Sequence, residues 1–336
     1  MLDRLGSSLP VLAAPMAGGP TTAALVLAAA DVGSAGFLAG GYKTPEAMAA
    51  EIDEVRARTS SYGVNLFAPN PSTAVDPAAY RDYRERLLPL AARYGVDLPV
   101  EPVEDDDWWR GKVDVLLEVA PPVVSFTFGI PERSVLDVLR RAGSLLVQTV
   151  ASPDEARRAT AAGVDGLVVQ SSDAGGHWGT LTPASPPERL AVPALVTAVR
   201  SVVALPVIAA GGVGSSADVS AALDVGAEAV AVGTLLLLAP EAGTNPGHRA
   251  GLTDRGEQLT THAFSGRPAG GLRNEFLAAY DGLAPLGYPA LHHLTSPIRR
   301  AAAAAADPEH VNLWAGTGYR SIEARPAGEI LRGLVR

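Results

Sequence analysis

A single histidine lies in a glycine-rich turn at residues 173–180, which read Asp-Ala-Gly-Gly-His-Trp-Gly-Thr. The turn directly follows the apolar run Gly166–Ser171, so a strand should end just before it. Gly175 and Gly176 would let the backbone approach a flat or phosphorylated ligand closely. Histidine is the side chain best suited to proton transfer near neutral pH. His177 is therefore the candidate catalytic residue, although a turn that merely holds a structural histidine explains the same pattern.

Two further turns of small residues follow predicted strands near the end of the series. They read Ala-Ala-Gly-Gly-Val at 209–213 and Ala-Val-Gly-Thr at 231–234. In a barrel, phosphate is commonly bound at this place by backbone N–H groups and a nearby helix N-terminus. Tight turns without a ligand are the alternative. The residues expected to bind phosphate are Gly211, Gly212, Ala231, Val232, Gly233 and Thr234.

Neutral amide side chains stand at other strand ends. Asn65, Gln148 and Gln170 can match the imide and ring nitrogens of a flavin. Met16 follows the first strand, where it would pack beneath a flat ring or simply belong to the core. The fingerprint of a dinucleotide site is absent after that strand, so a mononucleotide across the barrel mouth fits better.

Several other chemistries have little support in the sequence. The chain has no cysteine, which excludes disulfides, thiolate catalysis and cysteine zinc sites. It has only two lysines, so Schiff-base catalysis is poorly supported. No two histidines have a metal-ligand spacing, and we expect no metal site. The acidic run at 104–107 is interpreted as a solvated face within a surface excursion over Asp97–Asp114.

Short apolar runs alternate with alanine-rich helical patterns along most of the chain. Runs that are apolar throughout, rather than alternating, are typical of parallel strands covered on both faces. Eight such units in one series favour a closed (β/α)8 TIM barrel over an open sheet. The predicted strands are Val11–Ala14, Gly36–Ala39, Tyr62–Phe67, Val123–Phe128, Leu145–Val150, Leu167–Ser171, Pro206–Ala210 and Ala229–Leu238.

The helices between these strands include Pro45–Arg58, Pro153–Ala162 and a third barrel helix at Pro77–Tyr94. Residues 1–238 are therefore assigned to the barrel. Residues 239–307 are too long for one connection and should form a small, mostly helical lid domain inserted after the eighth strand. Residues 308–336 are expected to return to the barrel.

Composition limits the partners. A net charge of −9 argues against nucleic acid or an anionic membrane as the main partner. The first ten residues lack a signal-peptide pattern, and the longest apolar stretch is too short to span a bilayer. We expect a cytoplasmic protein that binds small molecules. Its oligomeric state stays open, with a homodimer as one alternative.

The chain resembles the nitronate monooxygenases, formerly called 2-nitropropane dioxygenases, which are FMN-dependent TIM barrels. The matching motifs include Gly-Val-Asn-Leu-Phe at 63–67, Ser-Phe-Thr-Phe-Gly-Ile-Pro at 125–131, Asp-Ala-Gly-Gly-His at 173–177 and Ser-Gly-Arg-Pro-Ala at 265–269. The resemblance implies that Asn65, Gln170 and Gly175 contact FMN, and that Gly212 and residues 231–234 hold its phosphate. It implies that His177 is the active-site histidine and that the lid covers the flavin.

The resemblance also implies a reaction: FMN and O2 oxidise an alkyl nitronate, or a nitroalkane, to a carbonyl compound and nitrite. An NAD(P)H-dependent flavin reductase of the same superfamily, acting on a quinone or an enoyl thioester, is the main alternative. A non-catalytic flavin-binding protein is a third. Two positions depart from the family pattern, which often has arginine where this chain has Trp178 and Gly270. These departures concern the substrate rather than the flavin.

Overall fold

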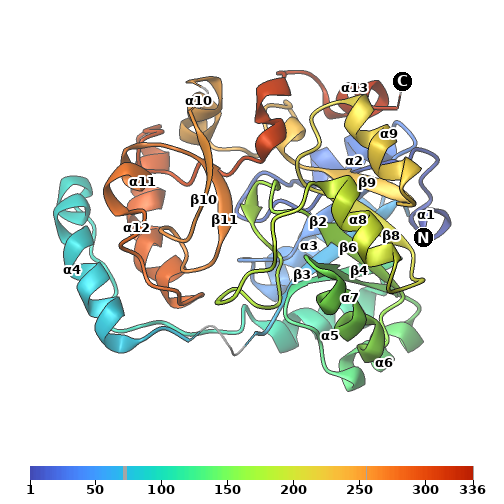
Figure 1. Cartoon of the computed structure of the whole chain (residues 1–336), viewed down its shortest axis with the longest axis horizontal. Helices are drawn as coiled ribbons and strands as arrows, with labels where there is room; N and C mark the ends of the chain where they lie inside the picture. The colour runs from blue at the N-terminus through green and yellow to red at the C-terminus, as the bar shows by residue number, and fades with distance from the viewer. Residues whose placement is uncertain (71–73, 255, 336) are drawn as a thin grey trace.

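Eight parallel strands close into a barrel in the order β1-β2-β3-β4-β5-β6-β8-β9. The computed structural model describes residues 1–70, 74–254 and 256–335. The closed (β/α)8 barrel predicted from the sequence is confirmed (Figure 1). Its strands are β1 (Val11–Ala13), β2 (Gly36–Ala39), β3 (Tyr62–Ala68), β4 (Val123–Phe128), β5 (Leu145–Val150), β6 (Gly166–Gln170), β8 (Val207–Ala210) and β9 (Ala229–Val232).

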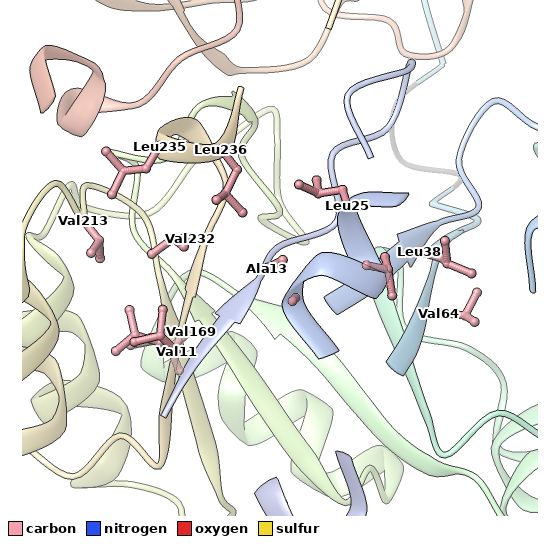
Figure 2. Packing of buried hydrophobic residues seen from close by; sticks show 14 of the residues in the cluster. Val11, Ala13, Leu25, Leu38, Val64, Val169, Val213, Val232, Leu235 and Leu236 are labelled. Atoms are coloured by element: carbon pink, nitrogen blue, oxygen red, sulfur yellow. The ribbon is translucent and has the colours of Figure 1, made fainter. Parts of the chain in front are cut away.

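Side chains along each strand alternate between the barrel interior and the surrounding helices. On β5, Val147 belongs to the interior cluster together with Leu12 and Ile208. Its neighbours Leu146 and Val150 belong instead to the large cluster between the strands and the helices. Figure 2 shows part of this outer cluster, where β1 and β2 pack beneath helix α2 (Ala23–Ala30). Both faces of the sheet are thus buried, which explains why the strands are apolar throughout.

Several helices around the barrel begin at residues whose side chains can cap a helix N-terminus. The hydroxyl oxygens of Thr44, Ser152 and Ser215 each accept the backbone N–H three residues later and so cap their helices. Besides α2, these helices are α3 (Pro45–Arg56), α5 (Trp109–Val119), α6 (Arg133–Ala142), α7 (Pro153–Ala162), α8 (Val192–Arg200), α9 (Ser216–Asp224) and α13 (Ala327–Gly333). The last of them packs against α2 and β1, and α1 (Leu2–Leu5) precedes the first strand.

The third barrel helix is not the one that the sequence predicted. Helix α4 (Pro77–Tyr94) has the predicted bounds, but it packs against α12 (Ala290–Ala304), away from the barrel (Figure 1). Helix α5 takes its place and contacts β3, α3 and α6. The excursion predicted over 97–114 therefore ends early, because Trp109 begins this barrel helix. Two amphipathic helices separate β3 from β4, and their periodicity alone does not tell which one covers the sheet.

A second core lies beside the barrel. Tyr80, Tyr83 and Leu87 of α4 are buried there with Leu291 and Leu294 of α12. We call α4 and residues 258–304 the cap. Besides these helices it contains β10 (Gln258–Thr261), β11 (Ala269–Leu272) and α11 (Glu275–Tyr280), and α10 (Pro246–Asp254) precedes it. Strands β10 and β11 form an antiparallel sheet with β7 (Gly176–His177), so the cap is joined to the barrel by backbone hydrogen bonds.

The eighth strand is shorter than predicted. It ends at Val232, and residues Thr234–Leu236 form the 3-10 turn η2. The leucines that follow are buried in the outer cluster, which explains why this stretch of the sequence is apolar. An apolar run of this kind does not distinguish a strand from a helical turn. Within the described part of the chain, no helix is both long and apolar enough to cross a membrane.

Candidate active site

A cavity opens at the carboxyl ends of the barrel strands, where active sites of this fold lie. Side chains that point along the barrel interior line its floor, and the cap and the segment 312–318 contribute its roof. All predicted site residues except Gln148 line this cavity. They are Met16, Asn65, Gln170, Gly175, Gly176, His177, Gly211, Gly212, Ala231, Val232, Gly233 and Thr234.

Gln148 lies outside the cavity. Its fully buried amide donates hydrogen bonds to the carbonyl oxygens of Phe126 and Thr149, at 3.3 and 3.1 Å. The alternation along β5 explains this placement, because Thr149 lines the cavity and its neighbour must point to the opposite face. The strand was predicted correctly, but the side chain of Gln148 points to the face of the sheet that lies away from the cavity.

One end of the cavity is lined by glycine backbone. Gly211 and Gly212 adopt φ of +100° and +76°, which only glycine adopts readily. A Cβ atom at Gly211 would lie 2.8 Å from the Ser171 carbonyl oxygen, and one at Gly175 would lie 2.6 Å from the Gly316 nitrogen. The Thr234 hydroxyl accepts the Gly316 N–H at 3.0 Å. These close contacts require glycine at each turn and leave a narrow cradle of backbone groups.

Amide and hydroxyl side chains form the middle of the cavity floor. The Asn65 side chain donates to the hydroxyl oxygens of Ser125 and Thr127, at 2.9 and 3.1 Å. The Gln170 side-chain oxygen accepts the Gly179 N–H at 2.6 Å. Both amides are therefore held in one orientation by their neighbours, which suits recognition of a planar ring with defined donors and acceptors.

At the other end, His177 lies on β7 opposite Ala269 of β11. Its Nε2 is 2.8 Å from the Ser265 hydroxyl oxygen. The rings of Phe128, Tyr288 and Trp314 surround it with centroids 5.6, 5.6 and 5.7 Å away. The Ser265 contact holds the imidazole of His177 in one orientation at the wall of the cavity.

Helix α12 contributes a cation and a stacked aromatic pair. The rings of His292 and Tyr42 are parallel, with centroids 4.1 Å apart. The Arg299 guanidinium donates to the His292 carbonyl oxygen at 2.8 Å and approaches its Nδ1 at 3.2 Å. It also donates to the Asn312 side-chain oxygen at 3.3 Å. Among the described residues no carboxylate forms an ion pair with Arg299, although this side chain lines the cavity.

Burial controls ionisation at this end. Burial, and then the positive charges of Arg267 and Arg299, lower the pKa of His177 to about 3. Burial is also the main cause that lowers the pKa of His292 well below its ordinary value. The pKa of Arg299 falls only to about 10, so this group stays charged. At neutral pH the site thus holds neutral imidazoles beside a guanidinium cation.

Sequence reasoning missed most of this second end. Tyr42, Arg299, Asn312 and Trp314 line the cavity, as do His248 and the glycines at 316 and 318. A local signal is carried by Tyr42, which closely follows β2, and by the glycine-threonine-glycine motif at 316–318. Of the two adjacent histidines on α12, His292 lines the cavity, whereas His293 contacts Asp105 at 2.7 Å. The described residues contain no group of three or more ligands able to hold a metal ion.

Trp178 and Gly270, the two positions that depart from the family pattern, are both tightly packed. Trp178 is 5% exposed, and its indole N–H approaches the Gln170 carbonyl oxygen at 3.4 Å. A Cβ atom at Gly270 would lie 2.2 Å from the Ala174 carbonyl oxygen. A larger residue at position 270 therefore could not enter without moving the loop that carries His177.

The family model described as nitronate monooxygenase matches residues 2–336. The chain belongs to the nitronate monooxygenase family. A probable nitronate monooxygenase of Staphylococcus aureus (strain JH9) is 34% identical over 342 residues, which cover 100% of this chain and 96% of that protein. The structure of a nitroalkane oxidase from Streptomyces ansochromogenes is 40% identical, with a TM-score of 0.93 over 99% of this chain and 96% of that one.

A more distant likeness is to FabK from Thermotoga maritima. It is 25% identical, with a TM-score of 0.77 over 99% of this chain and 93% of that one. Membership of the nitronate monooxygenase family makes the protein a flavin-dependent oxidoreductase. The cavity fits such a group. Its glycine turns have no room for a Cβ atom and so bring backbone close to a ligand, and its floor presents amides held in one orientation to a planar ring.

Proposed function

We propose that the protein binds FMN and uses O2 to oxidise alkyl nitronates to a carbonyl compound and nitrite. The observation that carries this proposal is that His177 and the Arg299 cation line the same cavity and interact electrostatically. A cation without a carboxylate partner favours an anionic ligand, because a buried charge is costly unless it is neutralised. A nitronate is such an anion, and its two oxygens can accept hydrogen bonds.

The residues fall into three groups in this proposal. Gly211, Gly212, Gly233 and Thr234 would hold the FMN phosphate, while Asn65 and Gln170 would hydrogen-bond the ring and Met16 would pack against it. When bound, FMN supplies the redox chemistry, by which electrons leave the nitronate and reach O2. The third group, which acts on the substrate, is His177 with Arg299.

The state of His177 supports a nitronate over a nitroalkane as the preferred substrate. A base with a pKa of about 3 is too weak to take a carbon-bound proton efficiently near neutral pH. A neutral imidazole can instead donate a hydrogen bond to a nitronate oxygen while Arg299 balances its charge. Ser265 assists if its hydroxyl donates a hydrogen bond to the histidine Nε2, because Nδ1 then carries the imidazole N–H.

The test is the visible spectrum of the FMN-loaded protein without oxygen, before and after propionate 3-nitronate is added. Bleaching of the flavin bands, followed by nitrite release when air is admitted, is the expected result. Bleaching by NADH or NADPH but not by the nitronate would replace this proposal with the reductase alternative. A protein that binds no FMN even after reconstitution would rule out both enzymatic functions.

A matched comparison then separates the two substrate forms. Nitroethane and its preformed nitronate are supplied at equal concentrations, and nitrite is measured before the two forms re-equilibrate. A higher kcat/KM with the nitronate is expected. Equal or higher kcat/KM with neutral nitroethane would mean that His177 acts as a base, contrary to the assignment above.

A further inference from the structure

A second cavity borders the main cavity at Phe128. Its volume is about 270 Å³, and Phe67 and Phe128 line both cavities. The residues found only in the second cavity include Asn70, Arg267 and Tyr288. The two cavities are thus separate spaces with a shared aromatic wall, and nothing in the proposed oxidation uses the second one.

Arg267 is the unusual residue of this second cavity. Its side chain is 0% exposed, and its guanidinium carbon lies 4.0 Å from the centroid of the Phe128 ring. Nη2 donates to the Thr180 carbonyl oxygen, while Nε and Nη1 have no hydrogen-bond partner among the described residues. A fully buried cation with unpaired donors is energetically costly, and a ligand that accepts these donors would relieve that cost.

No carboxylate of the described chain supplies the missing charge. Glu155 is the carboxylate that interacts electrostatically with Arg267, but it forms no ion pair with it. Its oxygens already accept hydrogen bonds from the backbone N–H groups of Ala151 and Leu181 and from the Thr180 hydroxyl. Among the described residues, therefore, no group accepts a hydrogen bond from Nε or Nη1.

The acidic run at the mouth of the cavity opposes an anion only weakly. Asp107 forms an ion pair with Lys112 at 2.6 Å, and Asp105 contacts His293 at 2.7 Å. Glu104 and Asp106 are exposed, so water and salt screen their charges. The Arg267 charge is buried and is screened far less. The buried charge of Arg267 therefore favours a negative ligand inside the cavity, whereas the acidic residues at its mouth should slow the entry of that ligand.

We propose that the second cavity is an anion-binding site in which Arg267 receives a small planar monoanion, such as a carboxylate or nitrite. Planar oxygens match the planar donors of a guanidinium, and the Phe128 ring already holds the guanidinium from one side. Both anions share this chemistry but come from different sources: nitrite would be the product of the proposed oxidation, whereas a carboxylate would come from elsewhere. The site itself does not depend on that oxidation.

The experiment is isothermal titration calorimetry of the FMN-loaded protein with sodium propionate and, separately, sodium nitrite, at constant ionic strength. Arg267→Met removes the charge, Arg267→Lys retains it, and Arg299→Met is the matched control in the first cavity. Because Arg299 also presents a cation, the event at Arg267 is expected to be the one that persists in Arg299→Met, that Arg267→Lys weakens by a few-fold and that Arg267→Met weakens at least tenfold. The anion that binds more tightly identifies the source.

Equal affinity in the native protein and Arg267→Met, or no binding of either anion, would overturn the proposal. If Arg267→Met does not fold, the native protein decides the matter. Crystals soaked in bromide should then show an anomalous peak beside Nε or Nη1 of Arg267, and the lack of such a peak would reject the site. Replacing Glu104 and Asp106 by Gln and Asn should tighten propionate binding about two- to fivefold at low salt.

Discussion

The two ends of the main cavity recognise ligands by different means. At one end, glycine turns of the barrel line the cavity with backbone, and a Cβ atom at Gly175 or Gly211 would clash with neighbouring backbone. At the other end, His177, His292 and Arg299 present side chains, and the supporting element is the cap. The backbone end has little freedom to vary, because it depends on φ angles and contacts that only glycine allows. The side-chain end depends on side-chain groups, so we expect single substitutions there to alter ligand binding while the fold is retained.

The largest expected effect comes from removing the histidine of the side-chain end. His177→Ala should lower kcat/KM for a nitronate by about 10²- to 10³-fold, because a positioned donor to the reacting anion is lost. FMN content should stay unchanged, since the glycine end is intact. Steady-state nitrite release and the flavin-to-protein absorbance ratio check both statements.

His293→Ala is the control for that measurement, because this neighbour of His292 on α12 contacts Asp105 outside the main cavity. It should leave kcat/KM within about twofold of the native value. Loss of FMN from His177→Ala would contradict the separation of the two ends.

The next effect concerns the cation of the same end. Arg299→Met should raise KM for a nitronate about tenfold to a hundredfold, with a smaller change in kcat, since a hydrogen bond to a charged group contributes about 1.5–3 kcal/mol. Arg300→Met, one position along α12 and exposed, is the matched control. A KM that is the same in Arg299→Met and Arg300→Met would remove Arg299 from the substrate site.

A substitution at the backbone end should instead weaken FMN binding and lower the stability of the protein. Gly211→Ala places a Cβ 2.8 Å from the Ser171 carbonyl oxygen at φ +100°. Strain of about 1–3 kcal/mol should lower thermal stability and release FMN. Gly143→Ala has a similar φ of +108° but open space around the new Cβ. It should lose stability and keep its FMN. Equal FMN retention in both variants would show that the cradle tolerates a side chain.

The smallest effect is a pH dependence of stability. The pKa of His177 is about 3 in the folded protein and about 6.5 when unfolded, so between these values only the unfolded chain binds the proton. Stability from this group is complete above pH 6.5 and falls as the pH falls towards 3. From pH 6.5 to 5.5, the native protein should lose about 1 kcal/mol more unfolding free energy than His177→Gln does. Urea denaturation at the two pH values measures this difference.

The same division explains what the sequence could predict. The strands, their order and the glycine turns are local features, because each turn directly follows its strand. Gln148 failed within this local set because a shift of one position turns a side chain to the other face. Arg299 and Trp314 come from segments that follow the barrel strands by tens of residues, and they reach the cavity only when the cap and the segment 312–318 pack on the barrel. No periodicity or spacing in the chain encodes that packing.

The assignment of α4 failed for the same physical reason. Its pattern correctly predicts an amphipathic helix from Pro77 to Tyr94. Amphipathicity shows that one face of the helix is buried, but it does not show which part of the protein buries that face. Helix α5 also buries apolar residues, Val113 and Leu116, and it lies next to the barrel. The second core, which the tyrosines of α4 share with α12, is the fact that decides between them.

That arrangement also has a consequence for the order in which the nascent protein can fold. Tyr83 of α4 donates a hydrogen bond to the Ala263 carbonyl oxygen, 180 positions later in the chain. At a translation rate of about 5–20 residues per second, the ribosome needs roughly 10 to 40 s to make the intervening segment. During this interval the barrel strands can emerge and pair, while the apolar face of α4 has no partner. The cap core is thus completed only after the barrel strands have been made, and until then the apolar face of α4 is open to chaperones or aggregation.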